Sequence, residues 1–324
     1  MMNRAAWYLI VFTISAGLIG SLALLSTMVW NLAECDNHDA RPDNFLADCH
    51  SFGNYEHGAF FYALEPQALN NLEQADVILL GNSHLQFAFS GGAAPAFFGA
   101  RGLRYFLLGF GYIESSDFIR ALAERYALKP RILIINADPF FSHKRGMPAG
   151  QILGFRAPLT RMEYLFKAVA IKVGPALCVR LRISCSGHAT TIYRSRVHGQ
   201  WLLNNIREGE LTPIDSGKSP APPAVVAEAV SIGRDFLAIM KVDPSCVVLT
   251  GIPGGEDDPY AVDLAAQLAA RLGTKILNVT LPEMQTIDGS HMNSDTVRRW
   301  SESFFKKLPA VLEGCAAFKS AKQV

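Results

Sequence analysis

Residues 77–84 read VILLGNSH, an apolar run that passes at once into a glycine turn and a serine. A continuous rather than alternating apolar run is what a strand buried on both faces requires. Four further short runs of this kind follow along the chain: Leu103–Leu107, Ile132–Ile135, Val247–Thr250 and Lys275–Val279. The pattern predicts five strands of a parallel sheet.

Stretches with apolar residues at helical spacing lie between these runs. Four of them are clear: Phe118–Tyr126, Val225–Phe236, Ala261–Leu272 and Ser294–Leu312. The third stretch meets Gly273, a typical residue just beyond a helix end. Alternation of strands and helices favours a parallel sheet with helices on both faces, so the predicted fold is an α/β three-layer α/β/α sandwich.

The N-terminal segment Ala5–Trp30 contains no charged residue and no proline. A stretch of about 20 apolar residues spans the hydrocarbon of a bilayer. Arg4 precedes the segment and acids follow from Glu34 onward, so the positive-inside rule leaves residues 1–4 in the cytoplasm. We therefore predict a transmembrane anchor over residues 5–30, in a single-pass inner-membrane protein whose bulk is periplasmic or extracytoplasmic. A cleaved signal peptide is the alternative.

Six cysteines suit an oxidising compartment. Proximity in sequence makes Cys35 with Cys49, and Cys178 with Cys185, the most plausible pairs. Cys246 opens a strand-like run and is predicted to be a buried thiol. The chain has no C-x-x-C pair, so neither a zinc ribbon nor a thioredoxin-type site is indicated.

The exported part divides into several segments. We expect a connector over 31–70, a core formed by 71–140 together with 223–315, a basic and partly helical insertion with a linker over 141–222, and a tail over 316–324. From Lys144 to Arg207 there are eleven Lys and Arg residues against the single acid Glu163. This segment is interpreted as a solvated face, as a surface against anionic headgroups, or as a groove for an anionic glycan. A net charge of +1 and the predicted export argue against nucleic acid as a partner.

Two short motifs carry chemistry. Gly81-Asn82-Ser83-His84 follows the first strand, and Asp288-Gly289-Ser290-His291 lies between the last strand and the last helix. A serine becomes a nucleophile when an imidazole accepts its proton and a third group orients that imidazole. Each motif alone has a simpler interpretation, Ser83 as a helix cap and His291 as a surface histidine. Together they are expected to meet at the edge where parallel strands end.

This pairing resembles the SGNH/GDSL hydrolase superfamily, in which a serine follows the first strand and the triad closes with Asp-x-x-His. The resemblance covers about 76–141 and 224–312, and looks closest to membrane-anchored envelope proteins similar to those of alginate O-acetylation and teichoic acid D-alanylation. It implies a flavodoxin-like sheet, with Ser83 as nucleophile, His291 as general base and acid, and Asp288 as its orienter.

The same resemblance implies oxyanion donors after the second and third strands, where Gly109, Gly111 and Asn136 are the candidates. The family's aspartate before the serine is replaced here by Asn82, and Asp138 could donate only if protonated. Losing one oxyanion donor costs about 10²–10³ in rate. Candidate substrate-binding residues complete the site: Asn82, His84, Arg194 and Arg196. His84 adjoins Ser83, so a supporting role is favoured over that of a base.

The expected function is O-acetyl transfer to, or removal from, a cell-envelope or exported polysaccharide through an acyl-Ser83 intermediate. The alternative is an inactive glycan-binding or scaffold subunit of an export complex. Expected partners are an envelope glycan or lipid-linked saccharide, the membrane, and, by resemblance, a multi-span acyltransferase. The chain has no metal-ligand spacing, phosphate loop or dinucleotide fingerprint, so no metal or cofactor is expected.

Overall fold

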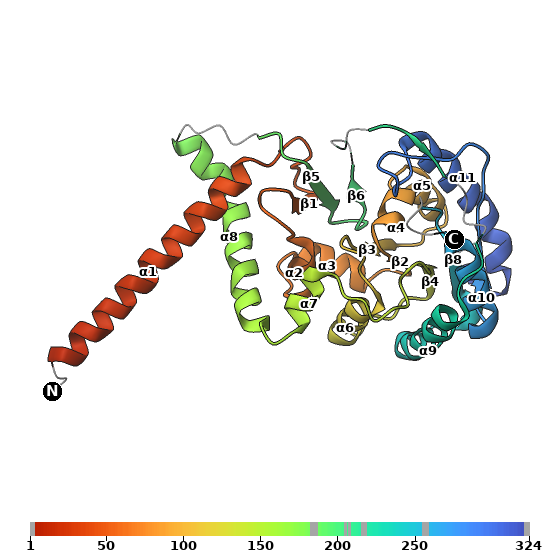
Figure 1. The fold of residues 1–324 in the computed structure, drawn as a ribbon, viewed down its shortest axis with the longest axis horizontal. Helices are drawn as coiled ribbons and strands as arrows, with labels where there is room; N and C mark the ends of the chain where they lie inside the picture. The colour runs from red at the N-terminus through yellow and green to blue at the C-terminus, as the bar shows by residue number, and fades with distance from the viewer. Residues whose placement is uncertain are drawn as a thin grey trace.

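A five-stranded parallel sheet forms the centre of the molecule (Figure 1). The computed structural model describes residues 4–181, 187–203, 206, 209–214, 219–254 and 259–320. The strand order is β3-β2-β4-β8-β9, with β2 Val77–Gly81, β3 Tyr105–Gly109, β4 Ile132–Asn136, β8 Val247–Thr250 and β9 Lys275–Ile276. All neighbouring pairs in this sheet are parallel. The predicted α/β class and the five strands are confirmed, although β9 ends three residues earlier than expected.

Each face of the sheet contributes to a different hydrophobic cluster. In β2, Ile78 and Leu80 belong to one cluster, while Val77 and Leu79 belong to the other, as the two-residue period of a strand requires. The first cluster is supplied by the helices α2 Glu56–Phe61, α3 Pro66–Glu73, α6 Ser116–Tyr126, α7 Met147–Leu153, α8 Ala157–Leu181, α9 Pro223–Met240 and α10 Ala261–Leu272. Helices that supply the second are α4 Ser83–Ala88, α5 Ala93–Gly99, α11 Ser294–Val311 and α12 Ala316–Ser320.

Local sequence fixes the ends of the predicted helices. The Ser115 hydroxyl caps α6 by accepting from the Asp117 backbone N–H, and the Asn293 side chain caps α11 by accepting from Thr296 N–H. Gly273 ends α10 with a φ of +69°, a left-handed conformation that favours glycine. The helices therefore begin and end close to where the pattern placed them.

The connector and the basic insertion form one structural unit, contrary to the separate segments that the sequence suggested. Strand β1 (Asn44–Cys49) pairs antiparallel with β5 (Thr191–Ser195), which pairs with β6 (Trp201–Leu202). The long helix α8 (Ala157–Leu181) of the insertion packs against α1 (Arg4–Ala33). A two-stranded pair, β7 Thr212–Pro213 with β10 Gln285–Thr286, joins the insertion to the loop before α11.

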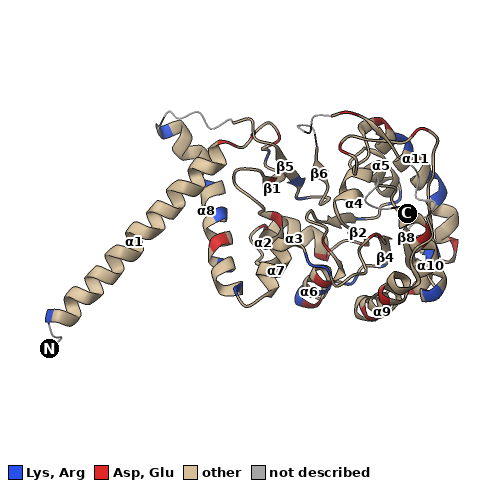
Figure 2. Cartoon of the chain, in the orientation of Figure 1, with Lys and Arg blue, Asp and Glu red and all other residues tan. Residues whose placement is uncertain are grey.

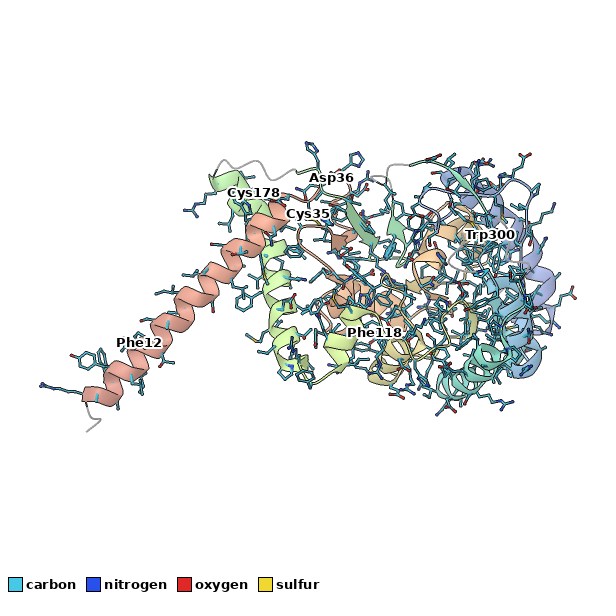
Figure 3. All side chains as sticks on the ribbon, in the orientation of Figure 1. Phe12, Cys35, Asp36, Phe118, Cys178 and Trp300 are labelled. Carbon is cyan, nitrogen blue, oxygen red and sulfur yellow. A yellow bond between two sulfur atoms is a disulfide. The ribbon has the colours of Figure 1, made fainter. Side chains whose placement is uncertain are left out.

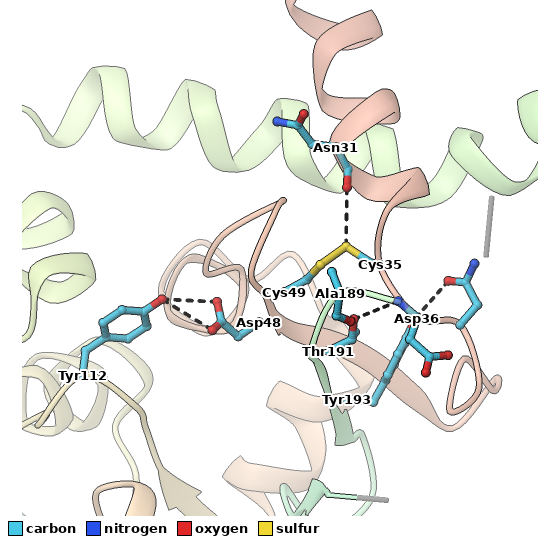
Figure 4. Close-up of a disulfide and its surroundings, with 10 residues drawn as sticks. Asn31, Cys35, Asp36, Asp48, Cys49, Tyr112, Ala189, Thr191 and Tyr193 are labelled. Atoms are coloured by element: carbon cyan, nitrogen blue, oxygen red, sulfur yellow. Dashed lines mark hydrogen bonds between the residues drawn. A yellow bond between two sulfur atoms is a disulfide. The ribbon is translucent and has the colours of Figure 1, made fainter. Parts of the chain in front are cut away.

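Disulfide bonds cross-link residues of this unit and residues of the main core. Cys35 and Cys49 are bonded as predicted, beside the carbonyl of Asn31 (Figure 4). Cys246 is not a free thiol: it is bonded to Cys315, 69 residues away, with a Cα–Cα distance of 4.8 Å. Cys178 is disulfide-bonded, and its predicted pairing with Cys185 lies outside the described residues.

The C-terminal segment, predicted as a tail over 316–324, contains a short helix. Residues Ala316–Ser320 form α12. Two 3₁₀ turns lie next to this helix: Pro244–Cys246 ends at one cysteine of the Cys246–Cys315 disulfide, and Leu312–Gly314 directly precedes the other. Phe318 is buried in the second cluster because its ring reaches Phe97. The described part of this tail is therefore core.

Helix α1 projects from the folded part, and the side chains of its residues 4–24, Phe12 among them, are exposed, whereas Phe118 and Trp300 lie fully buried (Figure 3). Its mean hydropathy is 2.2 over the most apolar window, and none of that window is buried. Among the described residues it is the one helix long and apolar enough to cross a membrane. Length and composition of this kind fit a membrane anchor or a signal sequence.

Candidate active site

The turn between β2 and α4 places Ser83 at the carboxyl end of the sheet. The order β3-β2-β4 shows that the chain changes direction beside β2, and such a switch point is where open parallel sheets bind ligands. Gly81 allows the turn, because a Cβ there would lie 2.9 Å from the Leu85 Cβ. Asn82 caps α4, since its Oδ1 accepts from the His84 backbone N–H at 3.0 Å. Ser83 is left partly exposed.

The loop before α11 folds around the carboxylate of Asp288. Its Oδ1 accepts backbone N–H groups from Ser290 at 2.9 Å and from His291 at 2.7 Å, and Gly289 turns the chain with a φ of +81°. Its Oδ2 lies 2.7 Å from His291 Nδ1. The loop therefore holds the imidazole by both its backbone and its ring.

A hydrogen bond of 2.8 Å joins His291 Nε2 to Ser83 Oγ. The two residues are 208 positions apart in sequence, yet the sheet brings their loops together. Phe87 of α4 stacks on the His291 ring with centroids 4.2 Å apart and restricts its tilt. Ser83, His291 and Asp288 are thus a continuous chain of hydrogen bonds, in the arrangement that activates a serine.

The charge of Asp288 determines which ring nitrogen of His291 can accept a proton from Ser83. Partial burial is the largest influence and raises the pKa of Asp288, but the hydrogen bonds from His291 and Ser290 together lower this pKa below its usual value. An ionised Asp288 accepts from Nδ1–H, which leaves the Nε2 lone pair to receive the Ser83 proton.

A second serine–histidine pair crosses the first. His84 Nε2 lies 2.8 Å from Ser290 Oγ. The serine of each Ser-His dipeptide is therefore hydrogen-bonded to the histidine of the other dipeptide. The two imidazole rings meet edge to face, with centroids 5.3 Å apart. We did not predict Ser290 as a site residue. The signal in the sequence was the repeated dipeptide, Ser83-His84 and Ser290-His291.

The environment of the second pair keeps His84 neutral. Burial, and to a smaller extent the nearby His291, lower the pKa of His84 to about 4. Behind it lies Asp138, whose Oδ2 is 4.0 Å from His84 Nδ1. Both of these atoms are buried and have no hydrogen-bond partner among the described residues. His84 therefore supports the loop through Ser290, and its ring has little access to a substrate.

The two asparagines proposed for the site hold the backbone. Asn136 is fully buried, its amide donates to the Asp138 carbonyl at 3.1 Å, and its Oδ1 accepts from Ile252 N–H. Asn82 donates to the same Asp138 carbonyl at 2.9 Å. The prediction that Asn136 donates to an oxyanion, and Asn82 to a substrate, therefore does not match their positions.

The two glycines differ in access. Gly109 is buried against α4: a Cβ there would lie 2.8 Å from the Asn82 carbonyl oxygen, and its own carbonyl accepts from Gln86. Gly111 is half-buried and lies beside the ring of Trp201. The Ser83 backbone N–H, first in α4, has no acceptor within the helix, because the first N–H groups of a helix lack one. It is the donor closest along the chain to the nucleophile.

Of the two arginines proposed to bind substrate, Arg194 lies in the interior and Arg196 is partly exposed. Arg194 has no exposed surface, pairs with Glu56 Oε2 at 2.7 Å and donates to the Leu107 carbonyl of β3. Arg196 pairs with Glu65 at 2.8 Å and also binds the carbonyl of Asn44. A buried cation needs such partners. Both arginines hold the insertion against its neighbours; Arg194 has no surface to offer a glycan, and the guanidinium of Arg196 is already paired with Glu65.

No group of three or more potential metal ligands occurs among the residues that the structure describes. Comparison with family models, with curated proteins and with solved structures finds no match to this chain. The chemistry of the site therefore has to be argued from its own geometry.

Proposed function

We propose that this chain is a serine-dependent acyl-ester enzyme of the SGNH/GDSL type, with the three-layer, flavodoxin-like sandwich of that superfamily. The parallel strand order with its switch point at β2, and a hydrophobic cluster on each face of the sheet, support the fold. The nucleophile follows the first strand of that sheet and the base precedes its last long helix, which is the placement that the superfamily resemblance implies.

One observation carries the proposal: the hydrogen bonds Ser83–His291 at 2.8 Å and His291–Asp288 at 2.7 Å. Serine, histidine and aspartate are hydrogen-bonded in the order that a catalytic triad requires, and the serine side chain is partly exposed to solvent. A histidine placed by chance on a loop has no reason to contact both a hydroxyl and a carboxylate.

The reaction follows from these contacts. Ser83 Oγ attacks the ester carbonyl while its proton passes to His291 Nε2, and the imidazolium is stabilised by Asp288. The C–O bond to the alcohol breaks, and His291 returns the proton to that alcohol, leaving acyl-Ser83. Water or a sugar hydroxyl then gives its proton to His291 and takes the acyl group, and His291 passes that proton to the departing Ser83 Oγ, which restores the serine. Water makes the enzyme an esterase, and a sugar hydroxyl makes it an O-acyltransferase.

We place this activity on a cell-envelope or exported polysaccharide, with acetyl as the acyl group. Helix α1 as a single-pass inner-membrane anchor, with the remainder periplasmic, would hold the site near lipid-linked or nascent glycans. Disulfides such as Cys35–Cys49 and Cys246–Cys315 favour an oxidising compartment. A multi-span acyltransferase would supply the acyl group if the direction is transfer.

The test uses the full chain in detergent with p-nitrophenyl acetate and with a serine-directed fluorophosphonate. Wild type should hydrolyse the ester and be labelled, whereas Ser83→Ala and His291→Ala should lose turnover. Ser231→Ala, an exposed serine on α9, is the matched control and should behave as wild type. Equal activity in all four proteins would end the enzyme proposal.

The alternative is an inactive glycan-binding subunit, and the positions of Asn82 and Asn136 favour it, since neither amide is free for an oxyanion. Titration of wild type with acetylated and deacetylated alginate separates the two. Binding without turnover or labelling would establish the alternative, and labelling at Ser83 would exclude it.

A further inference from the structure

Helix α8 is buried on one face only. Tyr164, Ala168 and Ala170 of α8 are buried in the hydrophobic clusters of the fold. A helix of a water-soluble domain would carry polar residues on its opposite face.

The opposite face of α8 is apolar and exposed. Leu159 is 73% exposed, Met162 52%, Leu165 38% and Val169 44%, and Phe155, just before the helix, is 91% exposed. Spacings of three and four residues place the four helical positions on one side. Contiguous exposed apolar side chains of this size mark an interaction surface. We call these five residues the outer face of α8.

Cations flank the outer face. Arg156, Arg161 and Lys172 are exposed, and no ion pair involves them among the residues that the structure describes. The one acid of this helix, Glu163, is neutralised by Lys167 at 3.1 Å. An apolar strip bordered by uncompensated cations is the composition of a helix that lies in the interface of an anionic membrane.

Helix α8 also packs against α1, the helix that would be the membrane anchor. Figure 1 shows α8 at the edge of the folded part from which α1 projects, and Figure 2 shows α1 without charge beyond Arg4, with basic positions along α8. The two helices pack where Gly174 meets Leu32: a Cβ on Gly174 would lie 3.0 Å from the Leu32 Cδ2. A cleft of about 440 Å³ opens beside this contact, with Val29 and Ile171 in its wall and Lys172 in its lining.

We propose that α8 is a second membrane-contacting helix, whose outer face lies in the headgroup and upper acyl-chain layer of an anionic bilayer. Leu159 and Met162 enter the apolar layer, Arg161 and Lys172 bind lipid phosphates, and an acyl chain fills the cleft beside α1. This inference does not depend on the acyl-ester chemistry. It gives the folded part a fixed orientation on the bilayer, which one flexible anchor alone would not.

The test places an environment-sensitive fluorophore on the outer face. Because the described cysteines are all in disulfides, an introduced cysteine is a selective labelling site. The full chain carrying NBD at Leu159→Cys or at Met162→Cys is reconstituted into vesicles of phosphatidylcholine, with or without phosphatidylglycerol. Glu228→Cys, exposed on α9, is the matched control.

We expect blue-shifted NBD emission at 159 and 162, with loss of intensity when brominated lipid is included, and neither effect at 228. Both effects should be larger with phosphatidylglycerol, and Arg161→Glu should remove that difference. Water-like emission at 159 and 162 would overturn the proposal. So would a blue shift without quenching by brominated lipid, since a second copy of the chain or another protein would then cover the face. Equal quenching in the two lipids would contradict the role of the cations.

Discussion

The two serine–histidine pairs of the site have the same bond length and different surroundings. Ser83–His291 and Ser290–His84 both measure 2.8 Å. Behind His291 stands Asp288, half-exposed and 2.7 Å from the ring, whereas behind His84 stands Asp138, buried and 4.0 Å away. A serine–histidine contact therefore does not make a nucleophile by itself. The third group and its solvent access decide which pair is poised to react.

The largest difference between the pairs should appear when each hydroxyl is removed. Ser83→Ala should abolish fluorophosphonate labelling and lower kcat on an acetyl ester by about 10⁴-fold, because the attacking atom is lost. Ser290→Ala should retain labelling and lose no more than about tenfold in kcat, because it removes only a support of the loop. If Ser290→Ala also lost labelling, the two pairs would not be distinct in role.

Replacing the carboxylate behind each histidine should also affect the two pairs differently. Asp288→Asn should lower kcat by about 10²–10⁴-fold, since an amide holds the imidazole in the wrong tautomer. Asp138→Asn changes a group that touches neither Ser83 nor His291, and we expect its effect on kcat to stay within about tenfold. Steady-state kinetics of the two variants, with labelling as a second readout, would decide. Similar losses in both would show that the second pair takes part in the chemistry.

The buried pair should control stability rather than rate. The pKa of His84 is about 4 in the folded protein and about 6.5 when exposed in the unfolded chain, so unfolding takes up a proton between these values. Stability should therefore fall as the pH drops from about 6.5 to about 4, by about 3 kcal/mol, and then level off. His84→Gln should flatten this slope in thermal melts from pH 4 to 8. Asp288 contributes at lower pH, because its folded pKa lies below the usual range.

The smallest expected effect concerns the ring that positions the exposed pair. Phe87→Leu removes the aromatic face 4.2 Å from His291 and should cost a few-fold in kcat and about 1 kcal/mol of stability. Phe89→Leu makes the same change in a buried ring packed on Trp300, away from His291. It should lower Tm without changing kcat. A kcat loss in Phe89→Leu equal to that in Phe87→Leu would attribute the effect to general loosening.

Local patterns in the sequence were enough to predict the five strands of the parallel sheet, the helices α1, α6, α9, α10 and α11, and the meeting of Ser83 with His291. The long helix α8 was expected only as part of a partly helical insertion. Apolar runs and caps are local, and the edge at which parallel strands end follows from their direction. The burial of Arg194 and the bond of Cys246 to Cys315 were not predictable in this way. Both depend on a partner from a distant segment of the chain. A local pattern gives the residue type at a position but does not show which distant segment will pack against it.

The crossed pairs were missed for a related reason. Adjacent side chains such as Ser83 and His84 point apart, so His84 was placed outside the proton path, which agrees with the structure. Its partner Ser290 became evident only when the two loops were seen to exchange bonds. Asn136 was expected to face the reacting group, but the turn after β4 draws its amide into the backbone of Asp138.

The cross-link between Cys246 and Cys315 closes a covalent ring around one half of the reaction centre. Asp288 and His291 lie inside that ring, while Ser83 lies outside it. Closing a ring of this size lowers the conformational entropy of the unfolded chain and so stabilises the folded state by about 4 kcal/mol. Reducing agents would consequently lower the free energy of unfolding of the fold that holds both halves, by about that amount.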